Sequence, residues 1–142
     1  PRYWQAISWY RWLPMVFTAD FAMMLSVISR DAESSPSAGG MVLVGEEYHK
    51  VVDCRVEAEF DERGEQTTMR CWAQTSEREY EITGEVISMI PLRNRRPAAT
   101  GEWLHTRITE AMTRFECDGH TGICMSEFLD QVVDGHPVGV PR

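Results

Sequence analysis

A strict alternation of apolar and charged residues between Val51 and Phe60 constrains the fold more than any other feature of the sequence. The apolar positions are Val52, Cys54, Val56, Ala58 and Phe60, and the charged positions between them are Asp53, Arg55, Glu57 and Glu59. A period of two is typical of a β-strand that buries one face and exposes the other. The segment therefore predicts a half-buried strand.

The residues Asp61-Glu62-Arg63-Gly64 follow this strand and are typical of a turn. If Glu62 and Arg63 form a two-residue loop, Cys54 faces Cys71 and Val56 faces Met69. The apolar faces of both strands then coincide, and a slip of one residue would destroy that match. The sequence predicts an antiparallel hairpin here.

Three further strands are predicted, over 21–28, 41–44 and 80–90. The continuous apolar run 21–28 suits a strand covered on both faces. The strand 80–90 is expected to end at Pro91. The next residues, 92–101, contain three arginines and one proline, and we interpret them as a solvated connection without assigned function.

A last hairpin is predicted between His105 and Val132, around Asp118-Gly119-His120-Thr121-Gly122. With His120 and Thr121 as the loop, Arg114 faces Glu127, Glu110 lies beside Gln131, and Cys117 faces Cys124. Both faces of this hairpin mix apolar and polar residues. We expect one face to line a cavity and the other to pack on a neighbour.

At least five strands and no long amphipathic helical pattern predict an all-β domain, an antiparallel meander, barrel or half-barrel built from hairpins. The formal net charge of −8 argues against nucleic acid as a partner. No run approaches a membrane span and no secretory signal is visible, so a cytoplasmic location is the default expectation. The start at Pro1, without Met, suggests a truncated or processed product.

The cysteines and histidines do not have the spacing of a metal site. Neither Cys-x-x-Cys pairs nor His residues four apart occur, so the sequence predicts no metal and no cofactor. We expect the thiols of Cys54, Cys71, Cys117 and Cys124 to be reduced and half-buried, because the cytosol disfavours disulfides.

Glu110 and Asp20 are the candidate catalytic acids. A dehydrated Glu110 without its own cation would have a raised pKa and could protonate an alkene or epoxide. Glu127 and Arg114 would then form an adjacent polar site, although a solvated cross-strand ion pair explains these residues equally simply. Asp20 precedes an apolar strand, where an Asp is also typical of a turn.

Large aromatic residues are concentrated between Pro1 and Leu13, including Trp4, Tyr10 and Trp12. Such rings could stack on a flat or polyene ligand or stabilise a carbocation. Core packing, or contact with another domain, is the alternative. Together with Met112 and Leu129 they are the predicted lining of an apolar pocket.

The closing hairpin also resembles a known group of proteins, in its segments 106–115, 118–122 and 125–131. These segments look like the end of proteins related to AttH and hydroxyneurosporene synthase (carotenoid 1,2-hydratase), and Pro1-Arg2-Tyr3-Trp4-Gln5 looks like the continuation of a strand that longer relatives carry. The resemblance extends over nearly the whole chain. It implies a lipocalin-like fold in which residues 1–142 are one β domain, the second of two.

Ligands in that group are isoprenoids and other lipids, and its hydratases add water to a double bond by acid catalysis without a cofactor. Three functions are therefore expected for this chain. The first is binding of an isoprenoid, lipid or steroid-like molecule in a β-barrel cavity. The second is a cofactor-independent hydratase or isomerase, and the third is a homo-oligomeric assembly domain without a ligand. A homodimer is compatible with all three.

Overall fold

The computed structural model describes residues 7–142, and the predicted ligand contact Trp4 lies outside them. The described part forms one antiparallel sheet of ten strands, in the order β4-β3-β2-β1-β9-β8-β7-β6-β5, with β10 pairing with β9. The strands are β1 (Trp9–Thr18), β2 (Phe21–Ser29), β3 (Ser37–Val44), β4 (Glu47–Val51), β5 (Asp53–Phe60), β6 (Gln66–Gln74), β7 (Glu79–Pro97), β8 (Trp103–Cys117), β9 (His120–Val133) and β10 (His136–Pro137).

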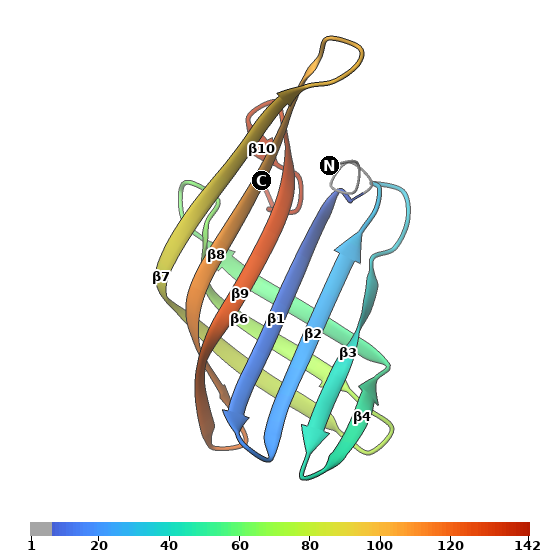
Figure 1. Ribbon diagram of the computed structural model, residues 1–142, viewed down its shortest axis with the longest axis vertical. Coiled ribbons are helices and arrows are strands. Elements are labelled where there is room, and N and C mark those ends of the chain that lie inside the picture. Colours follow the sequence, from blue (N-terminus) through green and yellow to red (C-terminus); the bar gives the residue numbers. More distant parts are fainter. Residues whose placement is uncertain (1–6) are drawn as a thin grey trace.

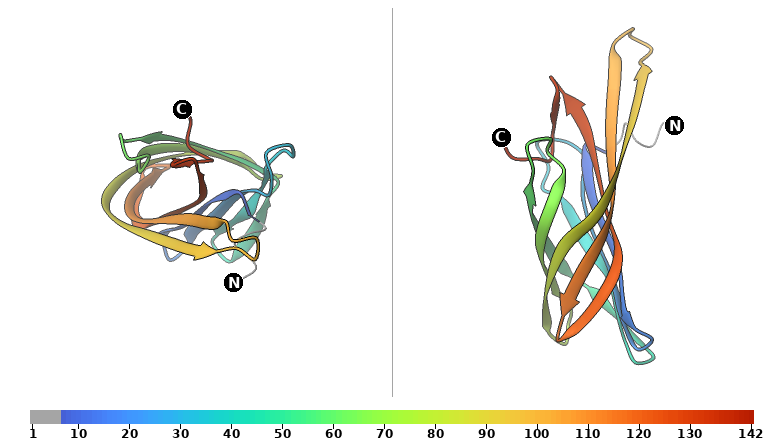
Figure 2. Two further views of the ribbon diagram at one scale, coloured as in Figure 1. Left: turned by 90° about the horizontal axis from the view of Figure 1, so that it is seen from above. Right: turned by 90° about the vertical axis from the view of Figure 1, so that its left-hand side faces the viewer.

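The sheet rolls up without closing, because β4 and β5 stand at opposite ends of the strand order. β5 and β6 cross behind β1, β2 and β3, as Figure 1 shows, and β5 contacts both β2 and β3. Seen from above, the strands surround a flattened interior (Figure 2). This open roll confirms the predicted all-β, antiparallel half-barrel.

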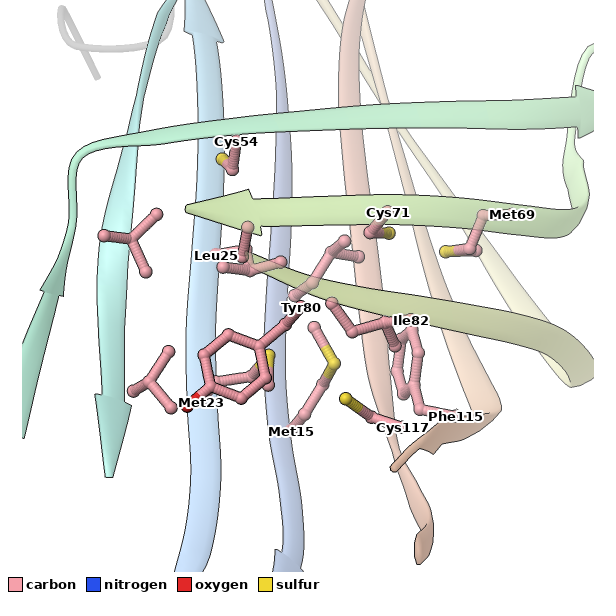
Figure 3. Packing of buried hydrophobic residues seen from close by; sticks show 14 of the residues in the cluster. Met15, Met23, Leu25, Cys54, Met69, Cys71, Tyr80, Ile82, Phe115 and Cys117 are labelled. Carbon is pink, nitrogen blue, oxygen red and sulfur yellow. The ribbon is translucent and has the colours of Figure 1, made fainter. Parts of the chain in front are cut away.

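The core fills the space between the two layers of the roll (Figure 3). Leu25 and Met15 come from the front layer, and Cys71 and Ile82 from the back layer. All four side chains are at most 1% exposed. Burial of such apolar surface stabilises the fold by roughly 25 cal/mol for each Å² removed from water, so the interdigitated core holds the layers together.

The first predicted hairpin exists, but its register differs by two residues from the predicted one. Cys54 pairs with Ala73, and Val56 pairs with Cys71. One residue of the shift comes from a longer turn, in which the Asp61 backbone N–H donates to the Glu65 carbonyl at 2.9 Å, and the other comes from a break in the register between Glu59 and Phe60. Because the shift is even, the predicted buried face is confirmed, with Cys54 and Cys71 both buried.

The register of the last hairpin was also predicted wrongly. The turn is Asp118-Gly119, with φ values of 51° and 77°, rather than His120-Thr121. Positive φ at both positions is typical of a type I′ hairpin turn, which Asp-Gly strongly favours. Cys117 consequently pairs with His120, so the predicted Cys117–Cys124 pairing is wrong.

The inward face of this hairpin is a packed polar core rather than a cavity wall. Thr113 and Ser126 share a hydrogen bond of 2.8 Å between their hydroxyl oxygens. Thr109 donates from Oγ1 to Gln66 Oε1 at 2.7 Å. Each of these side chains is at most 2% exposed. Their hydrogen bonds meet the requirement that buried polar groups be paired.

Strand β7 does not end at Pro91, as predicted, but continues to Pro97. Residues 92–97 are therefore strand and not a solvated connection. β7 pairs with β6 only through Glu85, so beyond that point one edge of β7 is open and a proline there breaks no ladder. The extended β7–β8 hairpin projects past the other strands (Figures 1 and 2).

Candidate functional site

A cavity of about 250 Å³ lies between the layers of the roll, at the end where the C-terminal segment returns. Trp9 and Val27 form its front wall, and Val56 and Phe60 form its back wall. The complete lining is Trp9, Arg11, Val27, Val56, Glu57, Ala58, Phe60, Gly139 and Pro141. Most of these side chains are apolar, so the cavity suits an apolar group.

Arg11 is the charged residue buried in this lining, where it is 4% exposed. Its Nη1 donates to Asp130 Oδ2 at 3.1 Å and its Nη2 donates to Asp130 Oδ1 at 3.2 Å. Nη2 also donates to the Gly139 carbonyl oxygen at 3.0 Å, and the Gly139 N–H donates to Asp130 Oδ1 at 2.8 Å. A two-pronged ion pair therefore fastens the C-terminal segment to β1 and β9.

Two aromatic rings flank the Arg11 guanidinium. Its carbon lies 4.9 Å from the centre of the Trp9 ring and 4.4 Å from the centre of the Phe128 ring. Burial lowers the pKa of Arg11, and the neighbouring Asp130 carboxylate opposes that shift. An arginine nevertheless stays charged inside proteins, so the pair is a permanent buried dipole beside the cavity.

The structure gathers most of the sequence-predicted site residues on the outer face of the sheet, away from this cavity. Tyr10 pairs with Leu129 and Trp12 pairs with Glu127 across β1 and β9, and Glu127 pairs with Glu110 across β9 and β8. Leu129 is buried, whereas Trp12 remains 37% exposed. Met112 lies on the same face of β8 and is 48% exposed.

Glu127 is a half-buried carboxylate on this outer face. The Tyr10 hydroxyl donates a hydrogen bond to Glu127 Oε1. Burial raises the pKa of Glu127. Glu110 lies directly opposite, so two carboxylates share one row of the sheet. Glu127, rather than the predicted acid Glu110, is therefore the better candidate for a proton donor on this face.

Arg114 lies on the outer face of β8 but away from Glu127, and Asp20 lies outside this group. Arg114 pairs with Ile123, not with Glu127 as predicted, because of the corrected register. It lines a separate surface hollow of about 630 Å³ with exposed side chains of β5, β6 and β7. Asp20 is exposed in the turn between β1 and β2, where its N–H donates to Thr18 Oγ1.

Sequence reasoning missed Arg11, Asp130 and the C-terminal Gly139. A signal was present, since alternation through Trp9, Arg11 and Leu13 places an arginine on the buried face of an otherwise apolar strand. A lone charge on such a face requires a buried partner. The sequence does not identify this partner, because β1 and β9 lie far apart in the chain.

Residues 7–142 contain free thiols but no cluster of metal-ligating side chains. No three His, Cys, Asp or Glu side chains there gather in a way that could hold a metal ion. The four cysteines are free thiols, and Cys54, Cys71 and Cys117 are buried. None of the described residues belongs to a helix long and apolar enough to cross a bilayer.

A comparison with protein-family models matches residues 1–132 to the family described as Domain of unknown function (DUF7064). No curated protein and no solved structure matches the chain. The comparisons do not test the resemblance to AttH and the carotenoid hydratases beyond this uncharacterised family, so that resemblance stays a prediction.

Proposed function

The chain belongs to the DUF7064 family, whose description assigns no activity, and we propose from its geometry that it binds a small, neutral, apolar molecule in the cavity at the end of the roll where the C-terminal segment returns. The observation that carries the proposal is the apolar wall formed by Trp9, Val27, Val56 and Phe60 between two sheet layers. Concave, mostly apolar cavities with few polar groups are the usual form of small-molecule sites.

The volume limits the size of the ligand. At about 250 Å³ the cavity is smaller than the roughly 300–1,000 Å³ typical of sites for drug-sized molecules. An apolar cavity of roughly 150 Å³ accepts benzene. A molecule of about one or two fused rings, or a short isoprenoid unit, therefore matches this cavity, whereas a long polyene would extend out of it.

The charge balance favours a neutral ligand. Asp130 and the Gly139 carbonyl already engage the Arg11 guanidinium. The carboxylate of Glu57, which also lines the cavity, pairs with Arg55 at 3.3 Å and is exposed. The charges at the cavity thus have partners within the protein, so an anionic ligand would gain little there. The flanking Trp9 and Phe60 rings favour a flat apolar group.

Two-dimensional amide NMR with 1-methylnaphthalene as the probe tests the proposal. Saturable shifts of the Trp9 indole N–H and of the Val27 and Val56 amides are expected. Val56→Phe should abolish them by filling the cavity, with Ala58→Leu as a second filling variant. Ile123→Phe is the matched control, because Ile123 is 57% exposed on the outer face. Shifts that survive both filling variants would contradict the proposed site.

The outer face supports a second candidate function, which is assembly with another copy of the chain. Several of its apolar side chains are more than a third exposed, which is unusual for a contiguous surface that stays in water. They include Trp12, Val16, Met24, Met41, Ile90, Leu92 and Met112. Sedimentation velocity over a range of concentrations should show a dimer, which Trp12→Lys would dissociate. Val52→Lys, at a 59% exposed position between β4 and β5, is the control.

The hydratase or isomerase alternative depends on which of these surfaces binds a ligand. A proton donor must reach the substrate directly or through one water. Glu127, whose pKa burial raises, lies on the outer face with Tyr10 and Trp12. NMR shifts of the Trp12 indole, in place of Trp9, would therefore favour acid catalysis by Glu127 over simple binding in the cavity.

A further inference from the structure

A second cavity, of about 240 Å³, lies on the inner side of the projecting β7–β8 hairpin and is lined mainly by basic side chains. Arg93 and Arg95 come from β7, His105 and Arg107 come from β8, and Arg63 comes from the turn between β5 and β6. The rest of the lining is Val132, Gly135 and Pro137. No carboxylate belongs to the lining, although the chain has 22 acidic and 14 basic residues.

The strand register places these basic side chains opposite one another, although burial and the neighbouring arginines lower the pKa of His105 and so favour its neutral form. Arg93 pairs directly with Arg107, and Arg95 pairs directly with His105. Like charges opposite each other on antiparallel strands destabilise the pair. The arrangement therefore works against the stability of the hairpin unless an anion neutralises it.

Arg107 is held in place by groups that leave its charge uncompensated. It is 4% exposed, and its Nη1 and Nη2 donate to the carbonyl oxygens of Arg63 and Gly64 at 2.8 and 2.6 Å. Its Nε is buried and has no hydrogen-bond partner in the described chain, and the same is true of His105 Nε2. Buried polar atoms rarely lack partners, so two adjacent side chains of one cavity each have an unused hydrogen-bonding atom.

The nearest carboxylates do not neutralise the cluster. Asp130 and Glu65 are the acidic groups whose charges act on Arg107. Both Asp130 oxygens are already bonded to Arg11. Glu65 and the already paired Asp130 are thus fewer than the four arginines that line the cavity, so a surplus of positive charge remains there.

From this geometry we propose that the cavity binds the phosphate group of a small, soluble phosphate monoester. Arginine forks match the oxygens of phosphate and form charge-assisted hydrogen bonds that are stronger than neutral ones. Arg107 and His105, which have the unpartnered Nε and Nε2 atoms, both line this cavity. About eight water molecules occupy this volume in liquid water. The cavity therefore has room for a small organic group beyond the phosphate.

Isothermal titration with phenyl phosphate, at constant ionic strength, tests the proposal. The double variant Arg93→Gln, Arg95→Gln should raise the Kd at least about tenfold, and both side chains are exposed, so the fold should persist. The control Arg30→Gln, Arg142→Gln removes the same charge from exposed positions away from the cavity and should bind like the unmodified protein. Shifts of the Arg107 Nε–H and His105 ring signals should accompany binding.

Several results would overturn the proposal. The first is the absence of saturable binding of phenyl phosphate or inorganic phosphate. The second is equal weakening in the two double variants, which would indicate general charge attraction. The third is cosedimentation with vesicles containing phosphatidic acid without binding of the soluble ester, which would make a lipid headgroup the ligand in place of a soluble molecule.

Discussion

The buried ion pair between Arg11 and Asp130 predicts a large loss of stability on Asp130→Asn. The substitution preserves shape but leaves a guanidinium that is 4% exposed without a countercharge, and turns an amide N–H₂ group toward it. Breaking a buried pair by removing one partner typically destabilises by 3–5 kcal/mol. Because one hydrogen bond from Gly139 can persist, we expect about 3 kcal/mol. For a domain of this size that corresponds to a fall in Tm of about 10 °C.

Urea unfolding, followed by circular dichroism and tryptophan fluorescence, gives the free energy of unfolding by linear extrapolation. Asp118→Asn is the matched control, because Asp118 forms a similar two-pronged pair with Arg78 whose side chains are 39% and 47% exposed. Exposed pairs contribute about 0–1 kcal/mol, and Asn tolerates the positive φ at this position. Equal losses in the two variants would refute the argument from burial. Arg11→Met combined with Asp130→Leu should recover most of the loss, since it removes both charges.

Three further predictions follow from packing and protonation. Gly122→Ala should destabilise by roughly 1–3 kcal/mol in the same urea assay, because its Cβ would lie 2.4 Å from the Val16 carbonyl oxygen, whereas the Cβ of Gly39→Ala would lie at an ordinary 3.9 Å from the Val51 carbonyl oxygen and this variant should lose less. The pKa of Glu127 is raised in the native state, so the native protein binds the proton more tightly and stability should fall as pH rises from the unfolded pKa through the native one. Glu127→Gln should flatten that pH dependence, and an unchanged profile would contradict the assignment. Burial raises the pKa of Cys117 to about 11, so about one in a thousand of its thiols is ionised at pH 8. Ellman's reagent at that pH should label the half-buried Cys124 first, and four thiols should react in denaturant without reductant.

The sequence was sufficient to predict which residues face the core, because alternation depends only on neighbours along one strand. Cys54, Cys71 and Met69 lie on the predicted apolar face and are buried, whereas Val52, just before β5, is exposed. The pairing registers of the two hairpins were harder to predict from the sequence, since each depends on the local geometry at its turn. The Asp61 carboxylate accepts hydrogen bonds from Arg63 N and Glu65 N, which stabilises a longer loop than a two-residue turn. An even slip leaves the faces unchanged, so the hydrophobic pattern could not reveal the error.

The candidate sites were less predictable than the core, because each joins distant parts of the chain. The apolar cavity combines β1, β2 and β5 with the C-terminal Gly139 and Pro141. The basic cavity could have been partly anticipated from Arg93 and Arg95, which are two residues apart and so share a strand face. Their interpretation as a solvated connection failed because Pro91 was taken to end the strand, whereas the open edge of β7 tolerates it.

The pairing of β1 with β9 has a consequence for how the chain folds during its synthesis. Trp9 pairs with Asp130, so the two central strands of the front layer lie about 120 residues apart in the chain and β1 is synthesised well before β9. Contacts between such distant residues form slowly, because a long loop must close before they stabilise anything. β1 to β4 can pair as a meander as soon as they leave the ribosome, but the other edge of β1 stays unpaired until β9 has been synthesised. During that interval the nascent chain exposes an unpaired strand edge, the feature through which partly folded proteins aggregate.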